Sequence, residues 1–248
     1  MKPILSKRLI ASSLLLLALT VPRLWAAPSI NSVNRSADKV GRYAKLELTV
    51  DLAATFTNAY NPDDVSLWAE FTSPSRKQWK INGFYDGMQW KIRFAANETG
   101  SWKYVVKAKD ATGSTEAPRA RFKCIPSTNH GWITIAPNHR YLAHDDGTSF
   151  YGVGACYPWG NTTNGFDQMQ ALGFNIYVYW NGTYDRAGGS NLIESFASGL
   201  GHYDQGKCQR LVDLIDWSVA RGLGMFLVIW PHDYLAEHLR GWPSKMDE

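Results

Sequence analysis

The sequence has few cysteines, and their spacing excludes several kinds of site. Cys124, Cys156 and Cys208 are the only three in 248 residues. They match no zinc or redox motif, and an odd number cannot all pair. One disulfide stays open as an alternative for an exported chain. Free buried thiols are favoured, because cysteine is often fully buried without a reactive role.

Net charge is also small once the start of the chain is set aside. The formal charge is +4, from 26 Lys and Arg against 22 Asp and Glu. Four of the positive residues, Lys2, Lys7, Arg8 and Arg23, lie within residues 1–27, where there is no acidic residue. The remainder carries 22 charges of each sign, so no basic stripe is left to neutralise phosphates. We therefore expect no nucleic-acid partner.

Only one long apolar run is present, at residues 9–21. It is shorter than the roughly 20 residues that cross a bilayer. A basic start precedes it, and the small residues Ala26 and Ala27 follow as cleavage positions, so residues 1–27 resemble a secretion signal. A retained anchor is the alternative. We expect a secreted or periplasmic protein with no stable membrane span after signal removal.

Motifs for cofactors and metals are missing as well. The apolar strand expected at residues 150–155 is followed by CYPW at residues 156–159, where a dinucleotide site needs a glycine-rich turn. No serine stands in a nucleophile elbow. His202 and Asp204 lie close together without a third ligand at metal spacing. We therefore expect neither a cofactor nor a bound metal.

Residues 28–127 have the period-two pattern of half-buried strands. Turn-forming sequences such as NPDD at residues 61–64 and ETG at residues 98–100 separate these strands. Several short strands within about 100 residues predict an all-β, immunoglobulin-like sandwich. The alternating apolar positions are Leu46, Leu48, Val50 and Leu52; Val65, Leu67, Ala69 and Phe71; Trp90, Ile92 and Phe94; Trp102, Tyr104, Val106 and Ala108; and Ala120, Phe122 and Cys124.

The pattern changes within DDGTSFYGVGACYPW at residues 145–159. A hairpin is expected around residues 137–139, and strands then alternate with helices, which indicates parallel pairing with right-handed crossovers. Both an open sheet and a closed barrel use this pattern. We expect residues 128–248 to be the first part of a (β/α)8 TIM barrel, which needs eight repeats in about 250 residues. The expected strands are 150–155, 174–180 and 225–230, and the expected helices are 166–172 and 207–221.

Aromatic and polar side chains gather where these later strands end. Indole faces stack on the apolar side of a pyranose, while Asn, His and Asp reach its hydroxyl groups. Each residue has a structural alternative, because an indole also plugs a barrel and His232 or Asp233 also caps a turn. The long loop at residues 182–203 is either a wall of the site or a surface insertion. The candidate substrate-binding residues are Trp159, Trp180, Asn181, Trp230, His232 and Asp233.

Five segments resemble exported bacterial glycoside hydrolases that carry an immunoglobulin-like domain before a (β/α)8 barrel. The likeness covers nearly the whole chain after residue 27, and the first domain and the junction after it are the more specific part. The matching segments are NPDDVSLWAEFTSPS (61–75), GFYDG (83–87), WKIRFAANETGSWKYVV (90–106), GWITIAPNHRYLAHDDGTSFYGVG (131–154) and LVDLIDWSVARGLGMFLVIWPHD (211–233).

The resemblance implies hydrolysis of a poly- or oligosaccharide by two carboxylates, with retention of configuration. In such families the catalytic Glu residues follow barrel strands four and seven, so they are expected downstream of Glu248. His232 matches a His that lines the subsite around the cleaved bond. Two alternatives stay open: a non-catalytic carbohydrate-binding or surface-adhesion protein, and a polysaccharide lyase with the same accessory domain.

Overall fold

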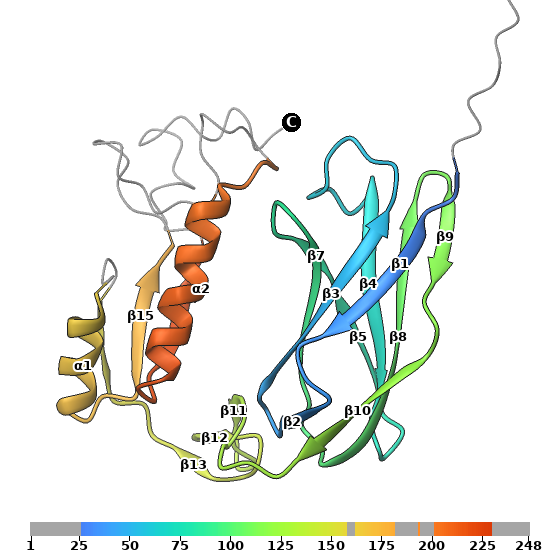
Figure 1. The fold of residues 1–248 in the computed structure, drawn as a ribbon. Helices are drawn as coiled ribbons and strands as arrows, with labels where there is room; N and C mark the ends of the chain where they lie inside the picture. Colours follow the sequence, from blue (N-terminus) through green and yellow to red (C-terminus); the bar gives the residue numbers. More distant parts are fainter. Residues whose placement is uncertain (1–25, 158–161, 182–192, 194–200, 230–248) are drawn as a thin grey trace, which may run out of the picture.

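The computed structural model describes residues 26–157, 162–181, 193 and 201–229. Strands account for 46% of the structure and helices for 13%. Figure 1 shows a large β-sandwich beside a smaller α/β unit, joined at one end by three short strands. Among the described residues, no helix is long and apolar enough to cross a membrane. The predicted signal at residues 1–27 lies almost wholly outside the described residues.

The sandwich consists of two sheets whose strands pair antiparallel, except that β2 runs parallel to β10. One sheet has the order β1 (Ser29–Arg35), β3 (Lys45–Ala53), β7 (Trp90–Ala95) and β6 (Phe84–Tyr85). The other has the order β2 (Lys39–Gly41), β10 (Ala120–Ile125), β8 (Gly100–Asp110), β4 (Val65–Thr72) and β5 (Gln78–Asn82), with β9 (Gly113–Glu116) beside β8.

The core between these sheets contains the apolar residues that alternate in the sequence. Phe71 of β4 and Phe94 of β7 come from opposite sheets, and their rings stack with centroids 4.0 Å apart. Trp102 and Ile92 are fully buried beside them. Each Å² of apolar surface removed from water stabilises the fold by about 25 cal/mol. The period-two prediction for these strands is confirmed.

A small antiparallel sheet links the sandwich to the rest of the chain. It contains β11 (Ile133–Ile135), β12 (Leu142–His144) and β13 (Ser149–Phe150), and it confirms the predicted hairpin. The hydroxyl of Tyr43, from the sandwich, donates a hydrogen bond of 2.7 Å to Asp145 in the turn after β12. This bond fastens the linking sheet to the sandwich.

The last unit is a parallel sheet of three strands with two helices. Its elements are β14 (Gly154–Cys156), α1 (Thr163–Ala171), β15 (Ile176–Trp180), α2 (Gln205–Val219) and β16 (Gly224–Val228). The carboxylate of Asp204 accepts from the Lys207 amide and caps α2, as expected of an N-cap residue. Gly173 ends α1 in the left-handed region, at φ +75°.

The predicted fold class, a sandwich followed by the first part of a (β/α)8 barrel, is wrong. The described chain is nearly all β, in several separate sheets, and the ring of helices around a barrel is missing from it. The three parallel strands form an open sheet. A βαβαβ pattern is shared by barrels and open sheets, so the pattern alone did not distinguish them.

The two faces of this parallel sheet are buried to different extents. Tyr177 and Tyr179 of β15 are buried under the helices, in one cluster with Phe166 of α1 and Leu214 of α2. On β16, Phe226 is 59% exposed. The helices therefore cover one side of the sheet, and the described residues leave part of the other open to solvent.

Candidate functional site

The carboxyl ends of the parallel strands lie together, as the sequence predicts for a ligand-binding edge. Trp180, the last residue of β15, is paired with Val228 of β16. The backbone amide of Asn181 donates to the Val228 carbonyl at 2.9 Å, and Asn181 is only 4% exposed. The side chain of Asn181 is thus buried, and its contact with a ligand stays a prediction.

Two of the six predicted binding residues are described, and they are neighbours at this edge. Trp180 is partly buried at the end of β15, with Asn181 directly after it. The other four, Trp159, Trp230, His232 and Asp233, lie outside the described residues, as does most of the loop at 182–203. Those four assignments therefore stay predictions.

A second candidate site, not predicted, lies between the sandwich and α2. It is a cavity of about 510 Å³, within the usual range of small-molecule sites, about 300–1,000 Å³. From α2 it is lined by Gln205, Cys208, Gln209 and Val212. These positions follow the i, i+3, i+4, i+7 spacing of one helical face. The opposite face of α2 packs on the parallel sheet through Leu211 and Leu214, so the helix separates the cavity from that sheet.

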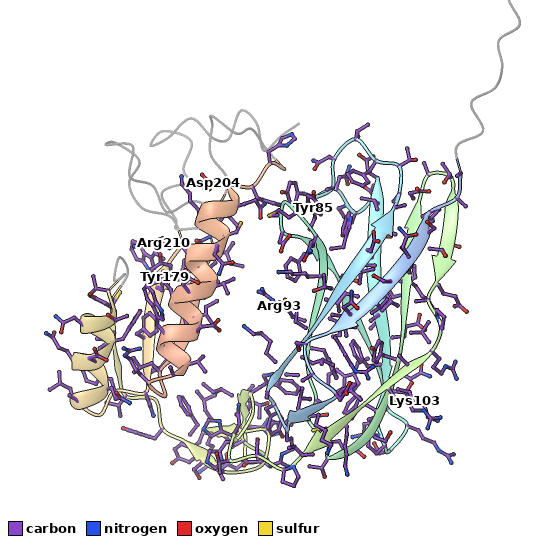
Figure 2. All side chains as sticks on the ribbon, in the orientation of Figure 1. Tyr85, Arg93, Lys103, Tyr179, Asp204 and Arg210 are labelled. Atoms are coloured by element: carbon purple, nitrogen blue, oxygen red, sulfur yellow. The ribbon has the colours of Figure 1, made fainter. Side chains whose placement is uncertain are left out.

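Aromatic rings surround the upper end of this cavity, near the N-terminus of α2. The ring of Tyr60 lies edge-on to Tyr203 at 4.9 Å and 6.0 Å from Tyr85. The Gln205 side-chain amide donates to the Tyr60 hydroxyl at 2.6 Å. In Figure 2, Tyr85 extends from the sandwich toward the end of α2 marked by Asp204. Both units thus contribute rings to this end of the cavity: Tyr60 and Tyr85 come from the sandwich, and Tyr203 comes from the segment before α2.

The charged residues of the cavity wall, Asp86, Lys91 and Arg93, all lie in ion pairs, although Glu47, the partner of Arg93, is outside the wall. Lys91 Nζ lies 2.7 Å from Asp86 Oδ2, and Arg93 Nε lies 2.7 Å from Glu47 Oε2. Burial raises the pKa of Asp86, but hydrogen bonds from Lys91 and from the Gln89 amide outweigh it and lower the pKa overall. Both carboxylates are therefore ionised at neutral pH, and the wall carries no net charge from these pairs.

The three cysteines are free thiols, as favoured from the sequence, but only Cys124 is buried. Cys156 is exposed at the carboxyl end of β14, and Cys208 is half-buried in the cavity wall. Burial raises the pKa of Cys208. In the part of the chain that the structure describes, no group of three or more His, Cys, Asp or Glu side chains is placed to hold a metal ion.

One sequence signal pointed toward the cavity without identifying it. The GFYDG segment, residues 83–87, supplies Gly83, Phe84, Tyr85 and Asp86 to the wall. Gly87 has φ +89°, and a Cβ there would lie 2.5 Å from Cγ of Gln205. A glycine at this position therefore lets α2 approach the sandwich, a contact between distant parts of the sequence that periodicity does not predict.

Comparisons with known proteins found one matching family model and several similar solved structures. Residues 39–109 match a family described as "Domain of unknown function (DUF5060)". A search of the curated proteins gave no match. Among solved structures, the chain is similar to a candidate glycoside hydrolase from Bacteroides vulgatus ATCC 8482. That match has a TM-score of 0.60 and 21% identity, and it covers 82% of this chain and 45% of that one.

A second structure, a family 39 glycoside hydrolase from the gut symbiont Bacteroides cellulosilyticus WH2, matches with a TM-score of 0.27 and 10% identity. It covers 79% of this chain and 33% of that one. A score this low does not establish a shared fold. The chain thus spans less than half the length of the structures named here. At such identities the likeness shows the fold alone: the protein has a fold related to that of a candidate glycoside hydrolase.

Proposed function

We propose that this chain is part of an exported glycoside hydrolase that acts on a poly- or oligosaccharide. The observation that carries the proposal is the fold match to the candidate glycoside hydrolase, because it extends over 82% of this chain and so beyond the sandwich. The signal-like start at residues 1–27 supports export. Fold alone does not fix activity, so the site must supply the chemistry.

The carboxyl edge of the parallel sheet is the proposed substrate site. Trp180 offers an indole to the apolar face of a sugar ring, and Asn181 offers an amide to its hydroxyl groups. Trp159, Trp230, His232 and Asp233 are proposed to complete the site. In this arrangement the residues of the chain bind and orient the sugar.

Bond cleavage is proposed to follow the two-carboxylate mechanism that the resemblance implies. One Glu protonates the leaving oxygen and a second attacks the anomeric carbon, and the carboxyls of a retaining enzyme lie about 5–5.5 Å apart. We assign neither role to a residue of this chain.

The test is release of reducing ends from a panel of polysaccharides by the full-length protein. We expect cleavage of at least one polysaccharide. Trp180→Ala should lower kcat/KM about tenfold, equivalent to about 1.4 kcal/mol of transition-state binding, and Trp180→Phe should recover part of the loss. Trp68→Ala is the matched control, since Trp68 lies on the sandwich under Lys80. A folded protein that cleaves nothing in the panel would refute the proposal.

A further inference from the structure

Two units that each have their own core build the cavity between the sandwich and α2. The sandwich core and the cluster around Phe166 and Leu214 are separate. Polar contacts join the units at both ends of α2. Asn58 donates to the Gly201 carbonyl at 3.2 Å, and Lys45 Nζ lies 3.4 Å from Asp216 Oδ2. The space between these contacts is the cavity of about 510 Å³.

The lining of this cavity combines ring faces with amide groups. Tyr85 and Tyr203 present aromatic surface, while Asn82 and Gln209 present side-chain amides. Aromatic surface packs against the C–H faces of a sugar, and amides both donate to and accept from its hydroxyl groups.

The charges on the wall restrict the class of ligand further. Lys91 is neutralised by Asp86, and Arg93 is neutralised by Glu47. Each of these cations already has a carboxylate partner, so the wall supplies no uncompensated positive charge that would favour an anionic ligand. An uncharged, hydroxyl-rich ligand leaves both pairs intact.

We propose that this cavity is a second saccharide site, which binds a neutral oligosaccharide between the sandwich and α2. The ligand class rests on the proposed function, whereas the position of the site rests on the geometry of the cavity. Because α2 lies between the cavity and the parallel sheet (Figure 1), the site is separate from the edge at Trp180. Its role is to hold a part of the glycan away from the strand ends and to clamp the two units together.

Two cysteines report on the two sites independently. Cys208 lines the cavity, and Cys156 ends β14 at the carboxyl edge. A bound ligand slows alkylation of the thiol that it covers, by about tenfold at ten times its Kd. Labelling with iodoacetamide near pH 9, where more of the Cys208 thiol is ionised, is followed peptide by peptide by mass spectrometry. The probes are cellotriose, xylotriose, mannotriose and laminaritriose, with trigalacturonate as the anionic comparison.

We expect at least one neutral trisaccharide to slow the labelling of Cys208 in the full chain, and trigalacturonate to have no effect there. Protection of Cys156 alone would leave the proposed function standing and overturn this inference. Protection of Cys208 by trigalacturonate alone, or of neither cysteine by any probe, would also overturn it. If the polysaccharide assay shows no hydrolysis while a trisaccharide still protects Cys208, the proposed function is refuted and the second site stands.

Variants give a second measurement that does not depend on thiol reactivity. Isothermal titration with the same trisaccharides should show binding weakened at least about tenfold, by about 1.4 kcal/mol, in Tyr203→Ala and in Gln209→Ala. The matched controls are Tyr141→Ala, at a tyrosine that is 67% exposed, and Gln170→Ala, at an exposed position of α1. Both controls should bind like the unaltered chain. Equal affinity in all four variants would overturn the proposal.

Discussion

The side-chain amide of Gln205, at the start of α2, donates a hydrogen bond of 2.6 Å to the hydroxyl of Tyr60 in the sandwich. The two residues are 145 positions apart in the sequence. This bond is one of several contacts that join the α/β unit to the sandwich beside the cavity.

Gln205→Leu removes this bond and leaves the Tyr60 hydroxyl without that partner. We expect the free energy of unfolding to fall by about 1 kcal/mol and the Tyr60 segment to exchange its amide hydrogens faster. Urea unfolding and hydrogen exchange measure the two effects. Gln170→Leu, at an exposed position of α1, is the control and should change neither. Unchanged exchange around Tyr60 in Gln205→Leu would show that this bond does not hold the units together.

Tyr43→Phe removes the hydrogen bond from Tyr43 to Asp145, which fastens the linking sheet to the sandwich. Asp145 is exposed, so we expect a loss of about 1 kcal/mol near neutral pH. Burial, with the bond to Asp145, raises the pKa of Tyr43 from 10.0 to about 12. A raised pKa means that the stabilisation is complete below pH 10 and is lost as pH rises toward 12.

The measurement is the stability difference between the unaltered chain and Tyr43→Phe across that alkaline range. The difference should stay constant up to about pH 10 and shrink above it. Tyr141→Phe, at an exposed tyrosine, should show almost no difference at any pH. A gap for Tyr43→Phe that widens above pH 10 would contradict the assignment.

Gly154 lies where β14 passes closest to β15. A Cβ at this position would stand 1.8 Å from the carbonyl oxygen of Ile176, a backbone atom that cannot move aside. Gly154→Ala should therefore disrupt the pairing of β14 with β15 and cost about 3 kcal/mol. Thermal unfolding of the full chain measures the loss. At Gly152 the nearest atom is 3.3 Å away, in the ring of Phe150, so Gly152→Ala is the control and should cost far less.

The sandwich contains a core of its own, so a polypeptide of residues 28–127 should fold alone. Phe71 is fully buried and stacked on Phe94, and Phe71→Ala should destabilise this polypeptide by about 3–5 kcal/mol. Phe56 is 38% exposed, so Phe56→Ala should cost much less. Urea unfolding followed by circular dichroism gives both values. A random-coil spectrum for the unaltered polypeptide would contradict the independence of the sandwich.

Local features of the fold were predictable from the sequence because they depend on neighbouring residues. Alternation predicted the strands around Leu48 and Val106. The helical pattern predicted helices at residues 166–172 and 207–221, close to the observed α1 and α2. Each of these depends on the backbone geometry of one element.

Features that join distant segments were not predictable. The apolar run at residues 174–180 predicts a buried strand, found as β15, but it does not show how many strands continue the sheet. For this reason the barrel was expected and an open three-stranded sheet is found. The cavity was missed for the same reason, since Tyr85 and Gln205 meet only in the folded chain. At the strand ends, Trp180 lies at the carboxyl end of β15 and is paired with Val228 of β16, while the binding roles of Trp180 and Asn181 stay predictions.

The most direct test of the proposed saccharide-binding edge is a crystal structure of the chain with the trisaccharide that binds most tightly in titration. We expect a sugar ring against the indole of Trp180, within hydrogen-bond distance of Asn181, at the carboxyl ends of β14, β15 and β16. A trisaccharide bound only to the outer face of the sandwich, for example at Trp68, would contradict the proposal and favour a carbohydrate-binding role for the sandwich instead.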